Sequence, residues 1–291
     1  LINLKEALNS KKVRFIKADI RDFDKIKNLF KNVHKVVHFA ALSDVVPSIV
    51  EPKLYMDNNI NGTINILESM KINGVKKIVY AASSSCYGIP KKYPTNENSP
   101  LDPRYPYAMS KLVCEDIIEH WSKVYGFSFL SLRLFNVYGT RSRTNSAYGA
   151  ALGVFLKQKI LNKPFTIVGN GNQRRDFIYV SDVCKAFYKA LTKNLPNNKF
   201  NIGFGKPRKV NEMVKIIGGS KTYVPKRPGE PDLTHANISK AKKFLLWKPQ
   251  ITLEKGLNMV LKNIDYWKDA PLWTPKKIKL ATKVWFKYIK H

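Results

Sequence analysis

The segment "KIVYAASS", residues 77–84, is a short apolar run that ends in serines. Comparable runs lie at 13–20 ("VRFIKADI"), 35–42 ("KVVHFAAL") and 129–139 ("FLSLRLFNVYG"). Short runs rich in β-branched and aromatic residues are typical of buried strands. Because helical patterns separate these runs, the sequence predicts an α/β fold with right-handed crossovers and a doubly wound parallel sheet that helices cover on both faces.

The helical patterns occupy 22–32, 54–74 and a stretch that begins near Pro106, and Gly74 provides a C-terminal stop for the second of them. Beyond residue 140 the chain becomes rich in turns. This change predicts a smaller α+β lobe after the sheet.

These patterns suggest three parts. We expect a first domain at 1–139, to which the chain returns near 177–193, then a second lobe at 140–268 and a basic amphipathic tail at 269–291. The tail is expected to dock on the body of the protein. The alternatives are contact with a partner or with an anionic membrane surface.

The composition, 44% hydrophobic and 12% aromatic over 291 residues, is that of a globular protein. The formal charge of +30 comes from lysines that are spread almost evenly, without a basic block or a nucleic-acid-binding motif. We therefore expect attraction to phosphate-bearing ligands rather than specific nucleic-acid binding.

Location and metal content can also be predicted. No apolar run approaches the roughly 18 residues of a membrane span. Cys86, Cys114 and Cys184 suit a reducing cytosol, so a cytoplasmic protein without a transmembrane segment is expected. The five histidines form no ligand-spaced set, and no metal is expected.

Ligands of parallel α/β sheets bind at the carboxyl ends of the strands. There the sequence places Ser83, Ser84 and Ser85, whose hydroxyls can point into a cleft. In "DPRYPYAMSKLVCEDIIEHW" (102–121), Tyr107 and Lys111 share one helical face at a spacing of four. Such a pair is either surface decoration or a proton-transfer pair, in which the ammonium lowers a phenol pKa that is normally near 10.

Six segments favour the second interpretation. They are "HFAALSD", "DNNINGT", "SSSCYG", the Tyr107–Lys111 pair, "LRLFNVYG" and "NQRRDFIYVSDV", in that order. Together they closely resemble the extended short-chain dehydrogenase/reductase family of NAD-dependent epimerases and dehydratases, in particular its UDP-sugar 4-epimerases. The resemblance runs from about residue 13 to about residue 265. It implies a Rossmann-type fold, NAD as cofactor, a UDP-sugar substrate and a homodimer formed through two long helices, 53–73 and 106–125.

The resemblance also predicts a gap. A dinucleotide-binding sheet normally opens with a glycine-rich loop, because glycine lets the backbone approach the pyrophosphate at a helix N-terminus. The sequence contains no GxGxxG or GxxGxxG, and its first predicted strand resembles the third strand of such a fold. We expect a chain that lacks roughly 30 to 40 residues at its start, one βαβ half-unit. Residues 1–291 alone are then expected to bind NAD weakly.

The resemblance implies roles for the serine, tyrosine and lysine. Tyr107 accepts the proton of the sugar 4-hydroxyl while C4 gives hydride to NAD, Lys111 holds the nicotinamide ribose, and Ser83 hydrogen bonds O4. The 4-keto sugar turns over and takes the hydride back on its other face. Dehydratases of the family follow the catalytic serine with an Asp-Glu pair, and decarboxylases place a glutamate two residues after it. Ser84 and Ser85 stand at these places and are expected to contact substrate, which favours epimerisation.

The same matching predicts binding residues. The cofactor residues are Asp19, Ile20, Phe39, Ala40, Ala41, Ser43, Asn58 and Phe135. The further substrate residues are Asn136, Tyr148, Ala150, Arg175, Arg227, Glu230 and Thr234. Arginine forks match diphosphate oxygens, and a carboxylate accepts well from ribose hydroxyls. Because Thr234 is small, we expect room for an N-acetyl group on sugar C2, and activity on both UDP-glucose and UDP-N-acetylglucosamine.

The leading hypothesis is thus an NAD-dependent UDP-sugar 4-epimerase that feeds polysaccharide synthesis. Two other functions stay open at this stage. One is another nucleotide-sugar epimerase, reductase or decarboxylase of the same fold. The other, of a different class, is a catalytically silent binding or scaffold protein that uses its basic surface.

Overall fold

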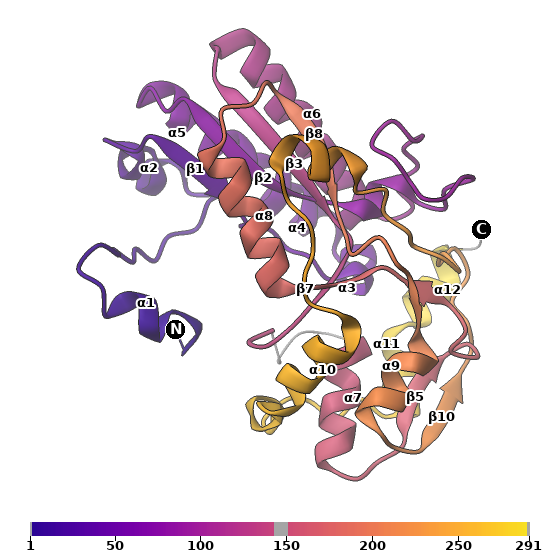
Figure 1. Cartoon of the computed structure of the whole chain (residues 1–291). Helices are drawn as coiled ribbons and strands as arrows, with labels where there is room; N and C mark the ends of the chain where they lie inside the picture. The colour runs from indigo at the N-terminus through magenta and orange to yellow at the C-terminus, as the bar shows by residue number, and fades with distance from the viewer. Residues whose placement is uncertain (1, 143–150, 290–291) are drawn as a thin grey trace.

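The computed structural model describes residues 2–142 and 151–289 of the chain. Its centre is a four-stranded parallel sheet in the order β1 (Lys35–His38), β2 (Lys77–Ser83), β3 (Ser128–Leu134) and β8 (Asn198–Ile202). The main helices that cover the sheet are α5 (Gly62–Ile72), α6 (Pro106–Tyr125) and α8 (Val180–Thr192). Figure 1 shows the sheet in the upper half of the molecule and a second group of elements below it.

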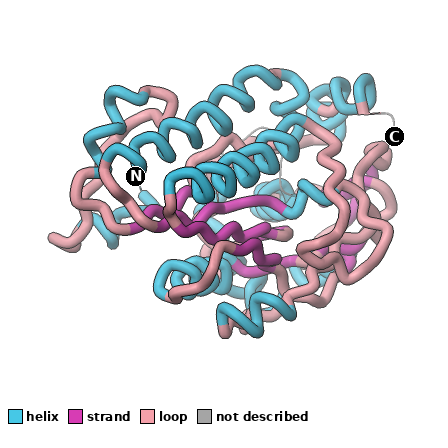
Figure 2. Tube along the Cα trace, turned by 90° about the horizontal axis from the view of Figure 1, so that it is seen from above, coloured by secondary structure: helices cyan, strands magenta, loops and turns pink. Residues whose placement is uncertain are grey.

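The two faces of the sheet carry different cores. On β2, Ile78, Tyr80 and Ala82 pack with side chains of α5 and α6. Val79 and Ala81 point the other way and pack with α8. Side chains alternate across a strand, so a strand buried on both faces is apolar along its centre, as β2 is from Ile78 to Ala82. Figure 2 shows helices on both sides of the sheet, which confirms the predicted doubly wound, Rossmann-type architecture.

The helix predicted at 54–74 forms in three consecutive pieces. These are α4 (Pro52–Met56), a π-helical turn η3 (Asp57–Asn61) and α5. Gly74, with φ of +67°, follows the last turn, as expected for a C-terminal stop. The π turn widens the helix at Asn58 and Asn59. The side chain of Asn59 contacts Leu42, in the loop that follows β1.

The other two predicted helices also form. The segment 22–32 contains α2 (Phe23–Ile26) and the 3₁₀ turn η2 (Lys27–Phe30). The helix α6 begins with Pro106 at its first position, where a missing N–H costs nothing, and ends at Gly126 in the left-handed conformation.

The strand predictions need three corrections. The strand predicted at 13–20 does not form: the segment is irregular, its large apolar side chains are exposed, and no described strand lies beside it to complete a ladder. The segment 35–42 is a strand only to His38. The run 129–139 is divided, because the chain leaves the sheet after Leu134 and forms the short strand β4 (Asn136–Tyr138), which pairs with β7 (Phe177–Tyr179).

The strand β8 belongs to the central sheet although it lies beyond residue 140, in the turn-rich region where the sequence predicted a separate α+β lobe. Beyond the sheet, the lower group is built on the parallel pair β5 (Phe165–Val168) and β10 (Lys221–Val224). Its helices are α7 (Ala151–Ile160), α9 (Val210–Ile217), α10 (Leu253–Leu261), α11 (Pro275–Ala281) and α12 (Lys283–Tyr288). The predicted domain boundaries themselves stay a prediction.

Smaller elements complete the chain. They are η1 (Ile2–Leu4), α1 (Lys5–Leu8), α3 (Val45–Val50), η4 (Ser84–Tyr87), β6 (Arg174–Arg175) paired with β9 (Arg208–Lys209), η5 (Ala241–Leu245) and η6 (Ile264–Trp267). The N-terminal turn contacts the rest of the molecule through Asn3, which donates to the Arg141 carbonyl at 3.0 Å. In the described part of the chain, no helix is both long and apolar enough to span a membrane.

Candidate active site

The serines predicted from the sequence lie at the carboxyl end of β2. Ser83 is the last residue of the strand and caps the 3₁₀ turn η4, accepting from the Ser85 N–H at 3.2 Å. The hydroxyls of Ser83 and Ser85 are 2.7 Å apart and hydrogen bonded. The strand therefore fixes Ser83, and the turn places the next two hydroxyls beside it.

Tyr107 lies in the first turn of α6, close enough to Ser83 for the serine side chain to influence the pKa of the phenol. Desolvation by the surrounding protein raises the pKa of Tyr107, and the Ser83 side chain opposes that rise. In the chain alone the phenol is therefore protonated at neutral pH. A positive charge beside it is needed to form the phenolate.

Lys111 follows one turn later on α6 and is only 4% exposed. Its Nζ lies 4.2 Å from the centroid of the Tyr80 ring. Burial lowers the pKa of Lys111 to about 8. Among the described residues no carboxylate forms an ion pair with this ammonium, so its donors suit neutral acceptors such as hydroxyl groups.

Asn59 holds the catalytic helix against the loop that follows β1. Its side chain accepts from the Leu42 N–H at 2.8 Å and donates to the Leu42 carbonyl at 3.0 Å. It also donates to the Ser110 hydroxyl at 2.8 Å, and Ser110 donates to the Tyr107 carbonyl at 2.9 Å. The sequence analysis did not select Asn59, although its place in "DNNINGT" was a usable signal.

Several predicted cofactor residues form a ledge after β1. Phe39 is 58% exposed although it continues a strand that ends in a buried histidine, and its ring packs on Phe187 at 4.5 Å between centroids. Ala40, Ala41 and Ser43 continue this ledge at the carboxyl edge of the sheet. These small residues, the exposed Phe39 ring and the buried Lys111 ammonium fit a dinucleotide. Its parts include a flat ring, a ribose with hydroxyl groups and phosphates.

The remaining cofactor candidates are less closely grouped. Asn58 donates to the Asn59 side chain at 3.0 Å and so lies next to the Leu42 loop. Phe135 is buried in a separate small cluster with Tyr87. Ile20 packs tightly on Gly62, where a Cβ would lie 2.4 Å from its side chain, and Asp19 forms a 2.7 Å ion pair with Arg21. The Arg21 hydrogen bond lowers the pKa of Asp19 to about 2.

The predicted diphosphate residues form one cluster. Glu230 forms ion pairs with Arg227 at 3.1 Å and with Arg175 at 3.6 Å. Burial lowers the pKa of Arg175, and the charge of Arg227 lowers it further. Asp232, the next acidic residue, pairs with Lys226 at 2.6 Å. Two guanidinium groups thus share one carboxylate, which leaves a positive charge suited to an anion.

Asn136 and Thr234 are joined directly. The Thr234 hydroxyl donates to the Asn136 side chain at 2.8 Å and accepts from the Asp176 N–H at 3.0 Å. Thr234 therefore links β4 to the strand pair that carries Arg175. Tyr148 and Ala150, also predicted to contact the sugar, lie outside the described residues.

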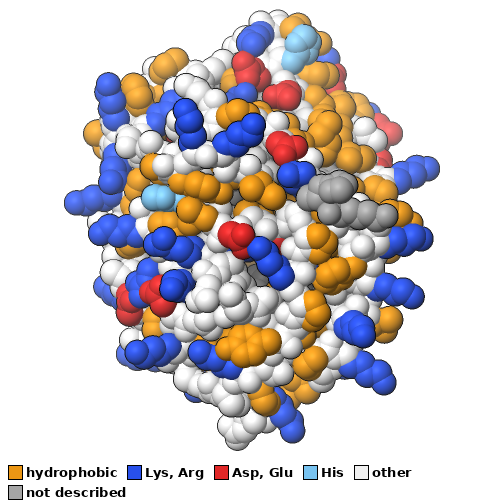
Figure 3. Space-filling model, turned by 90° about the vertical axis from the view of Figure 1, so that its right-hand side faces the viewer, with side chains coloured by type: hydrophobic (Ala, Val, Ile, Leu, Met, Phe, Trp, Pro, Cys, Tyr) orange, Lys and Arg blue, Asp and Glu red, His pale blue; other side chains and the backbone are white. Residues whose placement is uncertain are grey.

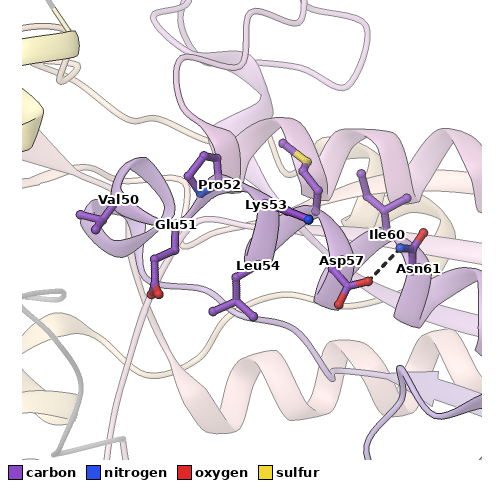
Figure 4. A pocket seen from close by; sticks show the side chains of 9 residues that line it. Val50, Glu51, Pro52, Lys53, Leu54, Asp57, Ile60 and Asn61 are labelled. Atoms are coloured by element: carbon purple, nitrogen blue, oxygen red, sulfur yellow. Dashed lines mark hydrogen bonds between the residues drawn. The ribbon is translucent and has the colours of Figure 1, made fainter.

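A surface depression and the distribution of basic side chains lie apart from these candidate residues. A depression of about 690 Å³ lies on α3, α4 and η3, and none of the catalytic candidates lines it (Figure 4). On the face shown in Figure 3, lysines and arginines are scattered rather than gathered in a stripe. Within residues 2–142 and 151–289, no group of three His, Cys, Asp or Glu side chains is placed to hold a metal.

A parallel sheet, with a serine at the carboxyl end of β2 and a tyrosine and a lysine on the adjacent helix α6, is typical of dehydrogenase-like nucleotide-binding proteins. The model of the NAD dependent epimerase/dehydratase family matches residues 2–203, and the chain belongs to this family. This result confirms the resemblance seen in the sequence and the expectation of an NAD-dependent enzyme.

Three similar proteins share a reaction but not a sugar. The UDP-glucuronate 4-epimerase of Thermodesulfobacterium geofontis is 33% identical, over 97% of this chain and 85% of its own. The structure of the UDP-glucose 4-epimerase of Thermotoga maritima with UDP-glucose matches with a TM-score of 0.83, 29% identity, and 89% and 86% coverage. The UDP-N-acetylglucosamine 4-epimerase of Methanobrevibacter ruminantium, with UDP-N-acetylmuramic acid, has a TM-score of 0.81, 29% identity, and 88% and 85% coverage.

Proposed function

We propose that the protein is a UDP-sugar 4-epimerase. The observation that carries the proposal is that Ser83, at the end of β2, comes close enough to Tyr107 in the first turn of α6 to oppose the rise that burial causes in the pKa of its phenol, with Lys111 one turn further along the same helix. A phenol beside a hydroxyl, with a buried ammonium one helical turn away, has the groups that a proton-transfer unit needs. The three similar proteins support a 4-epimerase reaction, and the different sugars in their names leave the substrate open.

The residues divide the chemistry between them. NAD, when bound, would supply a hydride acceptor that can also return the hydride. Tyr107 takes the proton from the sugar 4-hydroxyl as the C4–H bond breaks, and gives it back when the 4-keto group is reduced on its other face. Ser83 orients the reacting oxygen and keeps it near the phenol. Lys111 donates to the nicotinamide ribose and stabilises the phenolate.

The surroundings of Ser83 favour epimerisation over elimination or decarboxylation. Both of those reactions need a carboxylic acid or carboxylate beside the sugar. The turn η4 instead presents Ser84 and Ser85. Their hydroxyls are not ionised at physiological pH, so they cannot replace a carboxylate as a base. Hydride transfer out and back needs no further base.

In this proposal, the cluster of Arg175, Arg227 and Glu230 binds the nucleotide. Arg175 and Arg227 would contact the diphosphate oxygens, and Glu230 would release part of its hold on them to accept from a ribose hydroxyl. The same proposal includes a homodimer through α5 and α6, which pack against each other and leave Met109 and Val124 exposed on α6. A cytoplasmic location stays a prediction.

The direct test is interconversion of UDP-sugars by the full chain with added NAD. Incubation with UDP-glucose or UDP-N-acetylglucosamine in deuterium-free buffer, followed by anion-exchange chromatography, should give the galacto epimer without net NADH. Formation of a 4-keto-6-deoxy sugar or release of carbon dioxide would instead favour the other enzymes of this fold. If UDP-sugars and NAD are both shown to bind but the sugars stay unchanged, the proposal of epimerisation is wrong.

A further inference from the structure

The C-terminal segment Pro275–Tyr288 plays no part in the chemistry above. It contains α11 and α12 and lies beyond the family-matched range, and we call it the C-terminal strap. Ile278 anchors α11 to the second lobe, in a buried cluster with Val154 of α7 and beside Val224 of β10. The chain then bends at Thr282, and α12 packs against α3, which follows the cofactor ledge.

Trp285 is the inward-facing residue of α12 and is 3% exposed. Its indole N–H donates to the Pro228 carbonyl at 2.7 Å. The Arg227 guanidinium lies over its ring, 5.3 Å from the centroid. A cation held over an indole face is attracted to it, more strongly when both are desolvated. Trp285 therefore contacts two consecutive residues, Arg227 and Pro228, through two different interactions.

The arginine loop, residues 226–230, has no helix or strand of its own to fix it. It follows β10 as irregular chain, and Gly229 adopts a left-handed conformation with φ of +69°. Glycine in this region leaves the loop conformationally free. The contacts from Trp285 and the ion pair to Glu230 are thus important restraints on the direction of the Arg227 side chain.

The other side of Trp285 reaches the catalytic helix. Its ring lies 5.8 Å from that of Tyr105, the residue just before α6. Tyr105 stacks on Tyr107 at 6.5 Å between ring centroids, with 6° between the planes. One tryptophan therefore touches both the proposed diphosphate cluster and the aromatic wall beside the proposed proton acceptor.

We propose that Trp285 is a positioning residue for the UDP moiety, which it orders by holding Arg227 and Tyr105 in place across the junction of the two lobes. The inference rests on the proposed function of this site. Trp285 itself is not expected to touch substrate. Its effect is transmitted by Arg227, so it should influence nucleotide binding more than the chemical step.

Three variants of the full chain test the inference. Trp285→Ala removes the ring and the indole donor, and Trp285→Phe keeps a ring but removes the donor. Phe286→Ala is the matched control, since Phe286 is the next residue of α12 and is 43% exposed. UDP affinity is measured by calorimetry, KM and kcat by epimerisation with saturating NAD, and folding by the thermal unfolding midpoint.

Trp285→Ala should weaken UDP binding about tenfold and raise KM similarly, with kcat changed by about twofold or less. Trp285→Phe should weaken UDP binding by about threefold, and Phe286→Ala should match wild type. Equal UDP affinity in wild type and Trp285→Phe would overturn the inference even if the alanine variant fails to fold. A wild type that binds UDP but interconverts no UDP-sugar would contradict the proposed function alone, and one that does not bind UDP would overturn both.

Discussion

The side chains of Ser83 and Tyr107 lie close enough together for the serine to oppose the rise that burial causes in the pKa of the phenol, although one residue ends a strand and the other lies in the first turn of a helix after a long intervening loop. The contact exists because the carboxyl end of β2 and the N-terminus of α6 meet at the same edge of the sheet. Its geometry makes the tyrosine the residue whose loss should be most informative.

Tyr107→Phe keeps the ring and its stack on Tyr105 but removes the proton acceptor. We expect kcat for UDP-sugar epimerisation to fall by about 10² or more, with UDP affinity little changed. Steady-state kinetics and calorimetry measure the two quantities. Tyr125→Phe, at the exposed end of the same helix, is the control. Near-normal turnover of Tyr107→Phe would exclude the proposed proton transfer.

Lys111 should make the fold sensitive to alkaline pH. Burial lowers its pKa to about 8 from an ordinary value of 10.5, so between these values the folded state binds fewer protons than the unfolded state. The free energy of unfolding should therefore gain a contribution as pH rises from 8 to 10.5, and the buried ammonium is destabilising at pH 7.

Lys111→Met should remove this contribution. At pH 7 the variant should be more stable than wild type, by up to about 3 kcal/mol, yet inactive, and the difference should shrink at pH 9.5. Urea unfolding at the two pH values measures it. Lys123→Met, an exposed lysine near the end of α6, should show no such pH dependence. A Lys111→Met protein that is less stable at pH 7 would show that the ammonium is stabilised by contacts other than those described.

Thr234 tests the choice of sugar. A tyrosine at this position fills space beside the proposed sugar site, so Thr234→Tyr should lose kcat/KM for UDP-N-acetylglucosamine while that for UDP-glucose is reduced less. Because the Thr234 hydroxyl bonds Asn136 and the Asp176 N–H, Thr234→Val is the control for those hydrogen bonds. If Thr234→Val shows the same selective loss, or if wild type ignores the N-acetyl sugar, steric exclusion at Thr234 is not the cause.

The buried pair of Glu115 and Arg133 supports the catalytic helix. The Arg133 guanidinium donates to Glu115 at 2.5 Å, and both side chains are 2% exposed. Glu115→Gln leaves the guanidinium buried without its countercharge, and we expect a loss of about 3 kcal/mol or more in the free energy of unfolding. Asp116→Asn, on the adjacent exposed position, should change it little. Denaturant titration compares them, and equal stabilities would mean that Arg133 is satisfied by its other contacts.

Much of this fold could be predicted from local patterns. Strand β2 is apolar from Ile78 to Ala82 because both of its faces are buried, and Tyr107 and Lys111 had to share a helical face at their spacing. The segment 13–20 shows the limit of such reasoning. Its residues have the composition of a strand, but a strand forms only beside a neighbour, and the described chain offers none there.

The site was less predictable where it depends on distant contacts. β8 contains Asn198 and Asn201, residues that favour turns, and becomes a strand because its backbone pairs with β3. Trp285 is one aromatic residue in a lysine-rich tail, and nothing in the adjacent sequence indicates that it reaches Pro228 and Arg227. Asn59 reaches Leu42 and Ser110 from the π-helical turn η3. The position of such a turn depends on how the helix packs and cannot be predicted from the amino-acid composition of the segment.

The four-stranded sheet pairs β1 with β2 on one side only, so within the described chain the opposite edge of β1 presents backbone N–H and C=O groups without strand partners. Unpaired edges are templates for adding another extended chain, and β1 is a short one with Lys35 at its exposed start. Protein concentration should therefore matter, because the edge strands of two molecules can pair with each other and satisfy backbone groups that stay unpaired in one molecule. Light scattering of the purified chain across a dilution series should show association beyond the dimer proposed through α5 and α6, and this further association should disappear on dilution.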